Sequence, residues 1–243
     1  MEEIERSLTD AGLVRRVGAG VAYTPQGKKL KSEIEDRVRD KFASLSAEEI
    51  ELPTLVDYAQ LKLDRRIELA RYFSSFKTTS TEGTKLLLAR TSEELAADYF
   101  LEGPDTEGMI YQIKTKFRNE DASELGFLRR REFTMLDAYS FDNDVEGMRN
   151  RYQNVRLGFS ELLQDLGIPY SMRDATEGCS FKVPSEEFLC ESDDLNGLEL
   201  GHIFQLGDIY TKPYGSDLMM GSYGLGIDRL VAAVALYEQG GSR

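Results

Sequence analysis

Apolar and polar positions along the chain follow the periods of helices and strands in turn. Residues 25–45 and 146–166 are amphipathic at helical spacing, which predicts two long helices. Residues 110–120 alternate in a way that suits a strand, and residues 131–141 predict a second strand after a polar, Gly-containing loop. A last apolar run over residues 227–239 predicts a helix that follows a strand and a glycine-spaced bend.

Shorter patterns complete the prediction. They suggest a short helix over residues 1–12, a turn or short strand over 18–24 and a charged helix over 57–76. A hairpin that turns at Glu82–Gly83 is expected over residues 76–88, and another helix over 92–100. The chain between the long helix and Gly226 is rich in strands. Strands that follow strands, with helices packed on one face, indicate an α+β domain built on a mixed, mainly antiparallel sheet flanked by helices.

Composition narrows the class of protein. The chain has 243 residues, of which 41% are hydrophobic and only six are proline, so we expect one globular domain over residues 1–243. No apolar run approaches the ~20 residues of a membrane span, and the acidic start does not resemble a signal peptide, so we expect no membrane partner. The net charge of −13 opposes binding to a polyanion, because such affinity comes largely from neutralised phosphates.

The two cysteines, Cys179 and Cys190, are eleven positions apart and have no second pair or companion histidine beside them. This spacing argues against a zinc site. Two scattered cysteines suit a reducing compartment, so we expect a cytoplasmic protein.

The first cluster of candidate site residues lies in residues 117–141. Arg118 and Glu120 are two apart on the predicted strand, so they project from the same face. Such a pair offers a cation to a phosphate and a carboxylate to an exocyclic amine. Arg129 and Phe133 approach the same place from the returning strand. A surface hairpin with solvated charge pairs is the alternative interpretation.

The second cluster lies at the glycine-spaced bend near the end of the chain. Backbone can approach closely at Gly221, Gly224 and Gly226. Asp228 is a plausible cap or first-turn acid of the following helix, which places Arg229 over the bend. The bend is neither a Walker A loop nor a dinucleotide fingerprint, since it ends a strand late in the chain.

Together the two clusters resemble the signature motifs of class II aminoacyl-tRNA synthetases, and specifically those of the prolyl enzymes. Motif 2 of that family is matched by Phe117, Arg118, Glu120, Arg129, Phe133 and Asp137. Motif 3 is matched by Gly224, Gly226 and Arg229. Residues 197–212 are similar to the prolyl segment Glu-x-Gly-His-Ile-Phe-Gln-Leu-Gly, and Thr91 and Glu93 match a Thr-x-Glu motif.

The resemblance implies ATP-dependent activation of proline or a related amino acid, with ATP and Mg²⁺ as cofactors. Its catalytic residues are Arg118, which holds the α-phosphate and the attacking carboxylate, and Arg229. The implied ATP contacts are Arg118, Glu120, Arg129, Phe133, Gln205 and Arg229. The implied amino-acid contacts are Thr91, Glu93, His202 and Ser222, and the implied Mg²⁺ ligand is Glu199. Gln205 shares its strand face with Ile203.

Each of these residues also has a simpler interpretation. Glu199 can be a solvated strand acid, and Phe133 can belong to the core, as most aromatic residues on strands do. His202 is the only histidine of the chain and can be a packed, hydrogen-bonded residue.

Several positions depart from the prolyl pattern. Ser92 and Glu186 stand where histidines are usual, Ser222 where cysteine is frequent, Arg130 replaces a small residue, and Asp228 adds a negative charge beside the nucleotide site. The segment over residues 179–188 also carries Phe181, Lys182 and Pro184 where small residues are usual. This bulkier, charged loop is expected to reshape the amino-acid pocket, so the expected substrate is proline or a relative.

The sequence leaves two functions open. The first is an adenylating enzyme whose acceptor is tRNA, a carrier protein or a small molecule, and the second is a non-catalytic paralogue that acts as a sensor or accessory subunit. We expect neither an anticodon-binding domain nor an editing domain inserted between Asp193 and Gly197. Pro53 matches the family's dimer-contacting position, which predicts a homodimer. For residues 1–35, a winged-helix DNA reader is an alternative interpretation.

Overall fold

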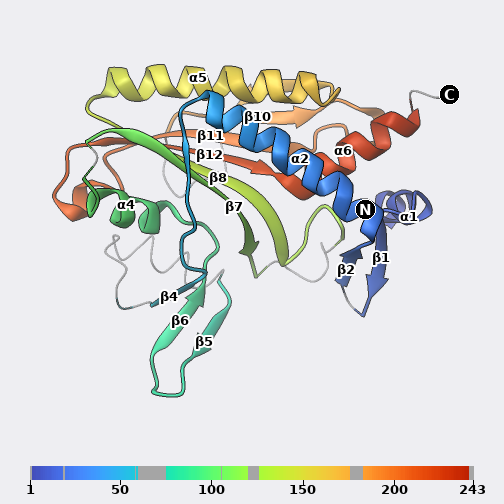
Figure 1. Ribbon diagram of the computed structural model, residues 1–243, viewed down its shortest axis with the longest axis horizontal. Helices are drawn as coiled ribbons and strands as arrows, with labels where there is room; N and C mark the ends of the chain where they lie inside the picture. The colour runs from blue at the N-terminus through green and yellow to red at the C-terminus, as the bar shows by residue number, and fades with distance from the viewer. Residues whose placement is uncertain are drawn as a thin grey trace.

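A seven-stranded sheet forms the centre of the molecule (Figure 1). The computed structural model describes residues 2–18, 20–57, 59, 75–104, 106–119, 126–175 and 183–240. In order across the sheet the strands are β3 (Glu48–Glu49), β7 (Gly108–Phe117), β8 (Glu132–Asp142), β12 (Met219–Gly226), β11 (Glu199–Gly207), β10 (Ser185–Cys190) and β9 (Tyr170–Asp174). The β3–β7 pair is parallel and the other pairs are antiparallel, which confirms the predicted mixed, mainly antiparallel sheet.

Three helices cover one face of this sheet: α2 (Pro25–Ser44), α5 (Val145–Asp165) and α6 (Ile227–Gly240) (Figure 1). The larger hydrophobic core lies between them and the sheet, where Phe42 of α2 and Phe159 of α5 are fully buried with Tyr223 of β12. Side-chain caps begin two of these helices. The Thr24 hydroxyl accepts the Gly27 amide of α2 at 3.1 Å, and the Asp144 carboxylate accepts the Gly147 amide of α5 at 2.8 Å.

A fourth helix, α4 (Glu93–Leu101), packs on the opposite face of the sheet (Figure 1). Its Phe100 ring stacks on Phe141 of β8 with centroids 4.1 Å apart. The expectation that the helices share one face is therefore wrong. Successive residues of β8 point to opposite faces, so Phe141 serves this smaller core whereas Ala138 serves the larger one.

Smaller elements surround the sheet. Beside α1 (Glu2–Asp10), the predicted turn or short strand is a hairpin of β1 (Val14–Val17) and β2 (Gly20–Tyr23). The predicted hairpin over residues 76–88 is confirmed as β5 (Lys77–Thr79) and β6 (Lys85–Leu88), which pair with β4 (Leu55–Asp57). Two short 3₁₀ helices are η3 (Asp193–Leu195) and η4 (Lys212–Tyr214).

The N-terminal segment shares the main core. Leu8 of α1 and Ile34 of α2 are buried in the same cluster as Leu230 of α6, so this segment does not form the separate DNA reader of the alternative interpretation. The charged helix predicted over residues 57–76 falls mostly outside the described residues, and Asp57 belongs to β4. Among the helices that the structure describes, none combines the length and apolarity needed to cross a membrane.

Candidate functional site

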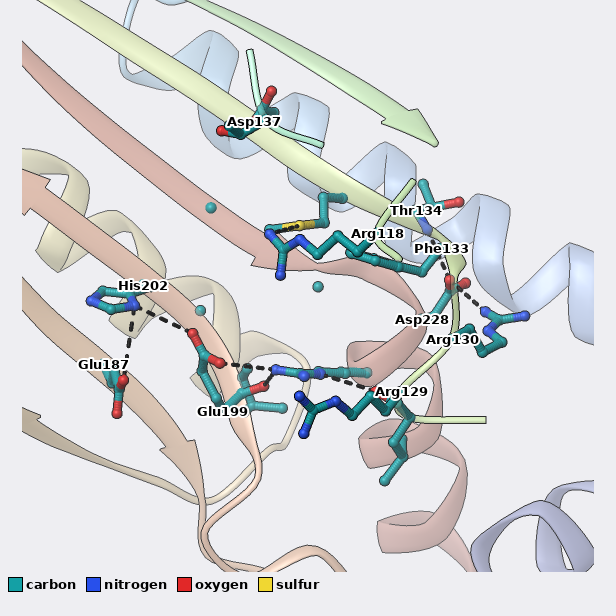
Figure 2. A pocket seen from close by; sticks show the side chains of 18 of the residues that line it. Arg118, Arg129, Arg130, Phe133, Thr134, Asp137, Glu187, Glu199, His202 and Asp228 are labelled. Carbon is teal, nitrogen blue, oxygen red and sulfur yellow. Dashed lines mark hydrogen bonds and ion pairs between the residues drawn. The ribbon is translucent and has the colours of Figure 1, made fainter. Parts of the chain in front are cut away.

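A cavity of about 360 Å³ opens on the sheet face opposite α2 and α5, and Figure 2 shows its side chains. It is framed by β8, β11, β12, the start of α6 and the segment before β8. The predicted site residues that line it are Thr91, Glu93, Arg118, Arg129, Phe133, Glu199, His202, Ser222 and Arg229. The fold thus brings together residues from five separate parts of the sequence, as predicted. Glu120 lies outside the described residues.

Arg118 and Phe133 form one wall of the cavity. Beyond the end of β7, the Arg118 amide donates to the Arg131 carbonyl at 2.9 Å, so the strand pairing continues to this residue. Its guanidinium lies over the Phe133 ring, 5.1 Å from the centroid, and one nitrogen is 3.8 Å from the sulfur of Met135 (Figure 2). A cation over an aromatic face is electrostatically favourable, so the ring also orients the guanidinium.

Arg229 forms the facing wall and is held by β11. Its Nη1 donates to the Glu199 carbonyl at 2.6 Å and lies 3.2 Å from the Glu199 carboxylate. Its Nε donates to the Leu128 carbonyl at 3.4 Å (Figure 2). These bonds fix one guanidinium against both β11 and the segment that carries Arg129.

A β-bulge places Glu199 and His202 on the same face. Phe188 of β10 pairs with Gly201 whereas the next residue, Leu189, pairs with Glu199, so Leu200 is the extra residue of β11. Three positions then separate two side chains that point the same way, and His202 Nδ1 lies 3.4 Å from Glu199 Oε1. Burial raises the pKa of Glu199, but the His202 hydrogen bond and the Arg229 charge outweigh it and lower the pKa to about 2.

Glu187 of β10 joins this pair as a third potential metal ligand. His202 Nδ1 is 3.9 Å from Glu187 Oε1, and ligand atoms of Glu187, Glu199 and His202 lie within 4.8 Å of one another. Carboxylate oxygens are the donors that Mg²⁺ prefers, so the two acids fit this cation whereas the imidazole adds a donor of another kind. The prediction of Glu199 as a metal ligand thus gains a neighbour that sequence reasoning missed.

The other end of the cavity carries the predicted amino-acid contacts. The Thr91 hydroxyl donates a short hydrogen bond to the Glu93 carboxylate. Ser222 of β12 is paired with Phe204 of β11, whose ring stacks on His202 with centroids 3.8 Å apart. Short polar groups and a stacked ring pair therefore line this end, which suits a small molecule with a charged amine and a compact apolar side chain.

A buried ion pair supports this end from below. Lys116 of β7 and Asp137 of β8 make a short contact in the core of the site, and Gln112 donates to the same Asp137 oxygen at 3.2 Å. Burial raises the pKa of Asp137, but the Lys116 charge and the hydrogen bonds lower it overall. Lys116 also donates to Ser92 Oγ at 2.6 Å, so the hydroxyl of this buried serine has a hydrogen-bond partner. Sequence reasoning missed Lys116, although it lies two residues before Arg118 on the same strand.

The structure corrects the predicted role of Gln205. The structure does not place it among the residues that line the cavity. Regular pairing of β11 with β12 from Ile203 to Gln205 keeps these two side chains on one face, and Ile203 is buried in the core beneath the helices. His202 and Phe204 point the other way, into the cavity, so the predicted ATP contact for Gln205 is wrong.

The structure also shows which side of the sheet Glu186 faces. Its carboxylate accepts the Tyr152 hydroxyl at 2.8 Å and the Arg156 Nε at 3.1 Å, both from α5 on the far side of the sheet. Glu186 itself therefore does not enter the amino-acid pocket, whereas Phe181 and Lys182 of the same expected loop lie outside the described residues. Its neighbour Glu187 faces the cavity instead, because adjacent strand residues point to opposite faces.

Two other departures from the prolyl pattern compensate one another. Arg130 Nη2 lies 2.5 Å from Asp228 Oδ2, so the added cation and the added acid form an ion pair at the edge of the cavity (Figure 2).

Comparisons with known proteins agree with this geometry. The family model described as the tRNA synthetase class II core domain (G, H, P, S and T) matches residues 76–237. A proline–tRNA ligase of Nocardia farcinica is 36% identical over 191 residues, which cover 76% of this chain and 32% of the relative. One of Rhodococcus opacus is 35% identical over 192 residues, which cover 76% and 33%. The chain spans about a third of the length of these relatives.

Solved structures show the same fold. Giardia lamblia prolyl-tRNA synthetase in complex with prolyl-adenylate superposes with a TM-score of 0.85 at 18% identity, over 96% of this chain and 51% of that one. The Cryptosporidium parvum enzyme complexed with L-proline and AMP gives 0.78 at 13% identity, over 96% and 52%. These likenesses confirm the predicted fold class.

Proposed function

Because the chain belongs to the family of class II tRNA synthetase core domains, we propose that it activates an amino acid with ATP to form an aminoacyl-adenylate. Proline or a close relative is the proposed substrate. The proline–tRNA ligases similar to this chain support that choice, and so does the compact, polar end of the cavity.

One observation carries the proposal. Arg118 and Arg229 line a single cavity, and the acids and hydroxyls of the predicted amino-acid site line the same cavity. Attack of a carboxylate on the α-phosphate of ATP develops negative charge and releases pyrophosphate, and it needs no covalent group from the protein. Positioning and electrostatic stabilisation therefore carry the rate, and two fixed guanidinium groups can supply both.

The proposed nucleotide contacts follow from the two walls. Arg118 binds the α-phosphate and the attacking carboxylate, and Phe133 and Arg229 stack on the two faces of the adenine. Arg129 steadies the outer phosphates, and Glu120 accepts the adenine amine. Mg²⁺, when bound, neutralises phosphate charge, and Glu199 together with Glu187 would hold it.

The proposed amino-acid contacts lie at the opposite end. Glu93, oriented by its bond from Thr91, accepts the substrate's charged amine. Ser222 and the stacked rings of His202 and Phe204 enclose the side chain. The buried pair of Lys116 and Asp137 keeps these groups in place.

An exchange assay tests the proposal. We expect the purified chain to exchange labelled pyrophosphate into ATP with one preferred amino acid out of a full panel, and proline is the expected choice. If the chain binds ATP but exchanges pyrophosphate with no amino acid, the result contradicts the proposed adenylating activity and favours a non-catalytic paralogue that acts as a sensor. Adding tRNA to the same reaction tests the acceptor, because transfer to tRNA discharges the adenylate. The net charge of −13 makes a carrier protein or small molecule the competing acceptors.

Two neighbouring acids on β10 give a second, sharper prediction. Glu187→Gln is expected to raise the KM for amino acid or Mg·ATP about tenfold, because Glu187 faces His202 and Glu199 in the cavity. Glu186→Gln is the matched control, since its carboxylate pairs with α5 on the other side of the sheet. Its KM values are expected to stay within about twofold of the wild type. Steady-state exchange kinetics on both variants give these KM values. A larger change in KM for Glu186→Gln than for Glu187→Gln refutes the conclusion that Glu187, and not Glu186, faces the cavity.

A further inference from the structure

The Asp228 carboxylate joins segments that lie far apart in the sequence. The side chain is buried, with 4% of the residue exposed. One oxygen accepts the Tyr23 hydroxyl at 2.6 Å and Lys31 Nζ at 3.2 Å. The other lies 2.5 Å from Arg130 Nη2 and accepts the Thr134 amide at 2.9 Å (Figure 2). One carboxylate thus holds the N-terminal hairpin, α2 and the start of β8 against the start of α6.

The bond to Thr134 continues a strand pairing after its partner strand has ended. The pairing of β12 with β8 runs to Gly226 opposite Met135, and α6 begins at the next residue, Ile227. Thr134 is therefore the first residue of β8 past that pairing, and its amide is taken by a side chain instead of a backbone carbonyl. Without this acceptor, a donor at the edge of the cavity would lose its partner.

The position of this bond matters because of its neighbours. Phe133 precedes Thr134, and Arg229 follows Asp228, so one hydrogen bond joins residues adjacent to both walls of the nucleotide cavity. We propose that Asp228 is a positioning residue that sets the spacing between Phe133 and Arg229 for the adenine ring. The inference rests on the proposed function and assigns to that site a residue outside the family's motif pattern.

Charge balance keeps the carboxylate in this place. Burial disfavours its charged form, but Arg130 and Lys31 outweigh this effect and hold the pKa of Asp228 below its ordinary value. Lys31 Nζ also donates to the Thr134 hydroxyl at 2.5 Å, so the cation contacts both partners of the key bond. An amide at position 228 loses both ion pairs and puts an NH2 donor in place of one oxygen, although both oxygens face donor groups, so the network that holds the Thr134 amide is disrupted.

The test compares ATP binding by the full chain and its variants, measured by titration calorimetry, with melting temperature measured in parallel. Asp228→Asn is expected to weaken ATP binding about tenfold, because the two walls are no longer preorganised for the ring. Asp142→Asn is the matched control. Asp142 is also a buried acid with an arginine partner, Arg151 at 2.7 Å, but it lies at the other end of β8. Its substitution is expected to lower the melting temperature and to leave ATP affinity within about twofold of the wild type.

The outcomes separate this inference from the proposed function. A wild-type chain that binds ATP but exchanges no pyrophosphate overturns the proposed function, and the affinity ratio still decides the role of Asp228. Equal ATP affinity of Asp228→Asn and wild type overturns the inference and leaves the function untouched. Asp228→Glu retains the charge at a shifted position, and its affinity is expected to fall between those of Asn and wild type. If Asp228→Asn does not fold, an Asp228→Glu protein with wild-type affinity overturns the inference.

Discussion

Arg118→Ala is expected to lower the rate of amino-acid-dependent pyrophosphate exchange by about 10²–10³, which is the usual cost of removing one donor to developing charge. The guanidinium lies over Phe133 in the wall of the cavity, and alanine leaves no hydrogen-bond donor at that position. The affinity for ATP is expected to fall by a smaller factor than the exchange rate, because the contact with Arg118 strengthens as the α-phosphate gains charge in the transition state.

Two further variants sharpen this experiment. Arg118→Lys retains a positive charge but loses the planar fork that can bind two oxygens at once, so its rate is expected to lie between those of alanine and wild type. Arg39→Ala is the control, because Arg39 is partly exposed on α2 and pairs with acids on the outer surface. An Arg118→Ala protein that exchanges pyrophosphate within about tenfold of the wild type contradicts the proposed role of Arg118.

The strands and helices were predictable wherever one period runs for several turns. The helical spacing of residues 25–45 and 146–166 gave α2 and α5 to within a residue or two, because one face of each helix is buried against the sheet. Alternation likewise located β7 and β8, and these two strands carry Arg118 and Phe133 to the cavity.

The two-residue alternation of a strand could not predict the β-bulge in β11. A strict two-residue alternation places Glu199 and His202 on opposite faces, and only the extra residue Leu200 brings them together. The family motif located both residues without explaining why they meet. For Gln205 the alternation itself was right, since it shares a face with Ile203, but that face proved to be the core. Which side of a central strand faces a cavity depends on what packs there, and no pattern within the strand records it.

Ion pairs between residues far apart in the sequence could not be predicted either. Arg130 and Asp228 each look like an isolated departure from a motif, and nothing in the spacing of the sequence joins them. The fold places them 2.5 Å apart because the start of α6 returns to the edge of β8. Lys116 shows the opposite case, since its spacing of two residues from Arg118 is enough to place both on one face, although sequence reasoning missed it.

Lys116→Met is expected to lower the free energy of unfolding at neutral pH by about 3–5 kcal/mol, the usual cost of removing one partner from a buried ion pair. Lys116 is 2% exposed and its partner Asp137 is 7% exposed, so water cannot replace the lost cation. Chemical denaturation followed by circular dichroism measures the loss. Lys41→Met is the control, because the partner of Lys41, Glu161, lies at the surface.

The pH dependence of this loss identifies its cause. In the wild type the lowered pKa of Asp137 stabilises the fold above the ordinary carboxyl pKa, and this contribution fades as pH falls through the folded pKa. Without Lys116, burial raises the pKa of Asp137, so the variant regains stability relative to wild type as the carboxyl takes a proton. The difference between the two proteins is therefore expected to shrink between neutral pH and about pH 4. The double variant Lys116→Met with Asp137→Asn is expected to be more stable at neutral pH than Lys116→Met alone, since no uncompensated charge remains. A pH-independent loss, unrelieved in the double variant, attributes the effect to packing and refutes the electrostatic account.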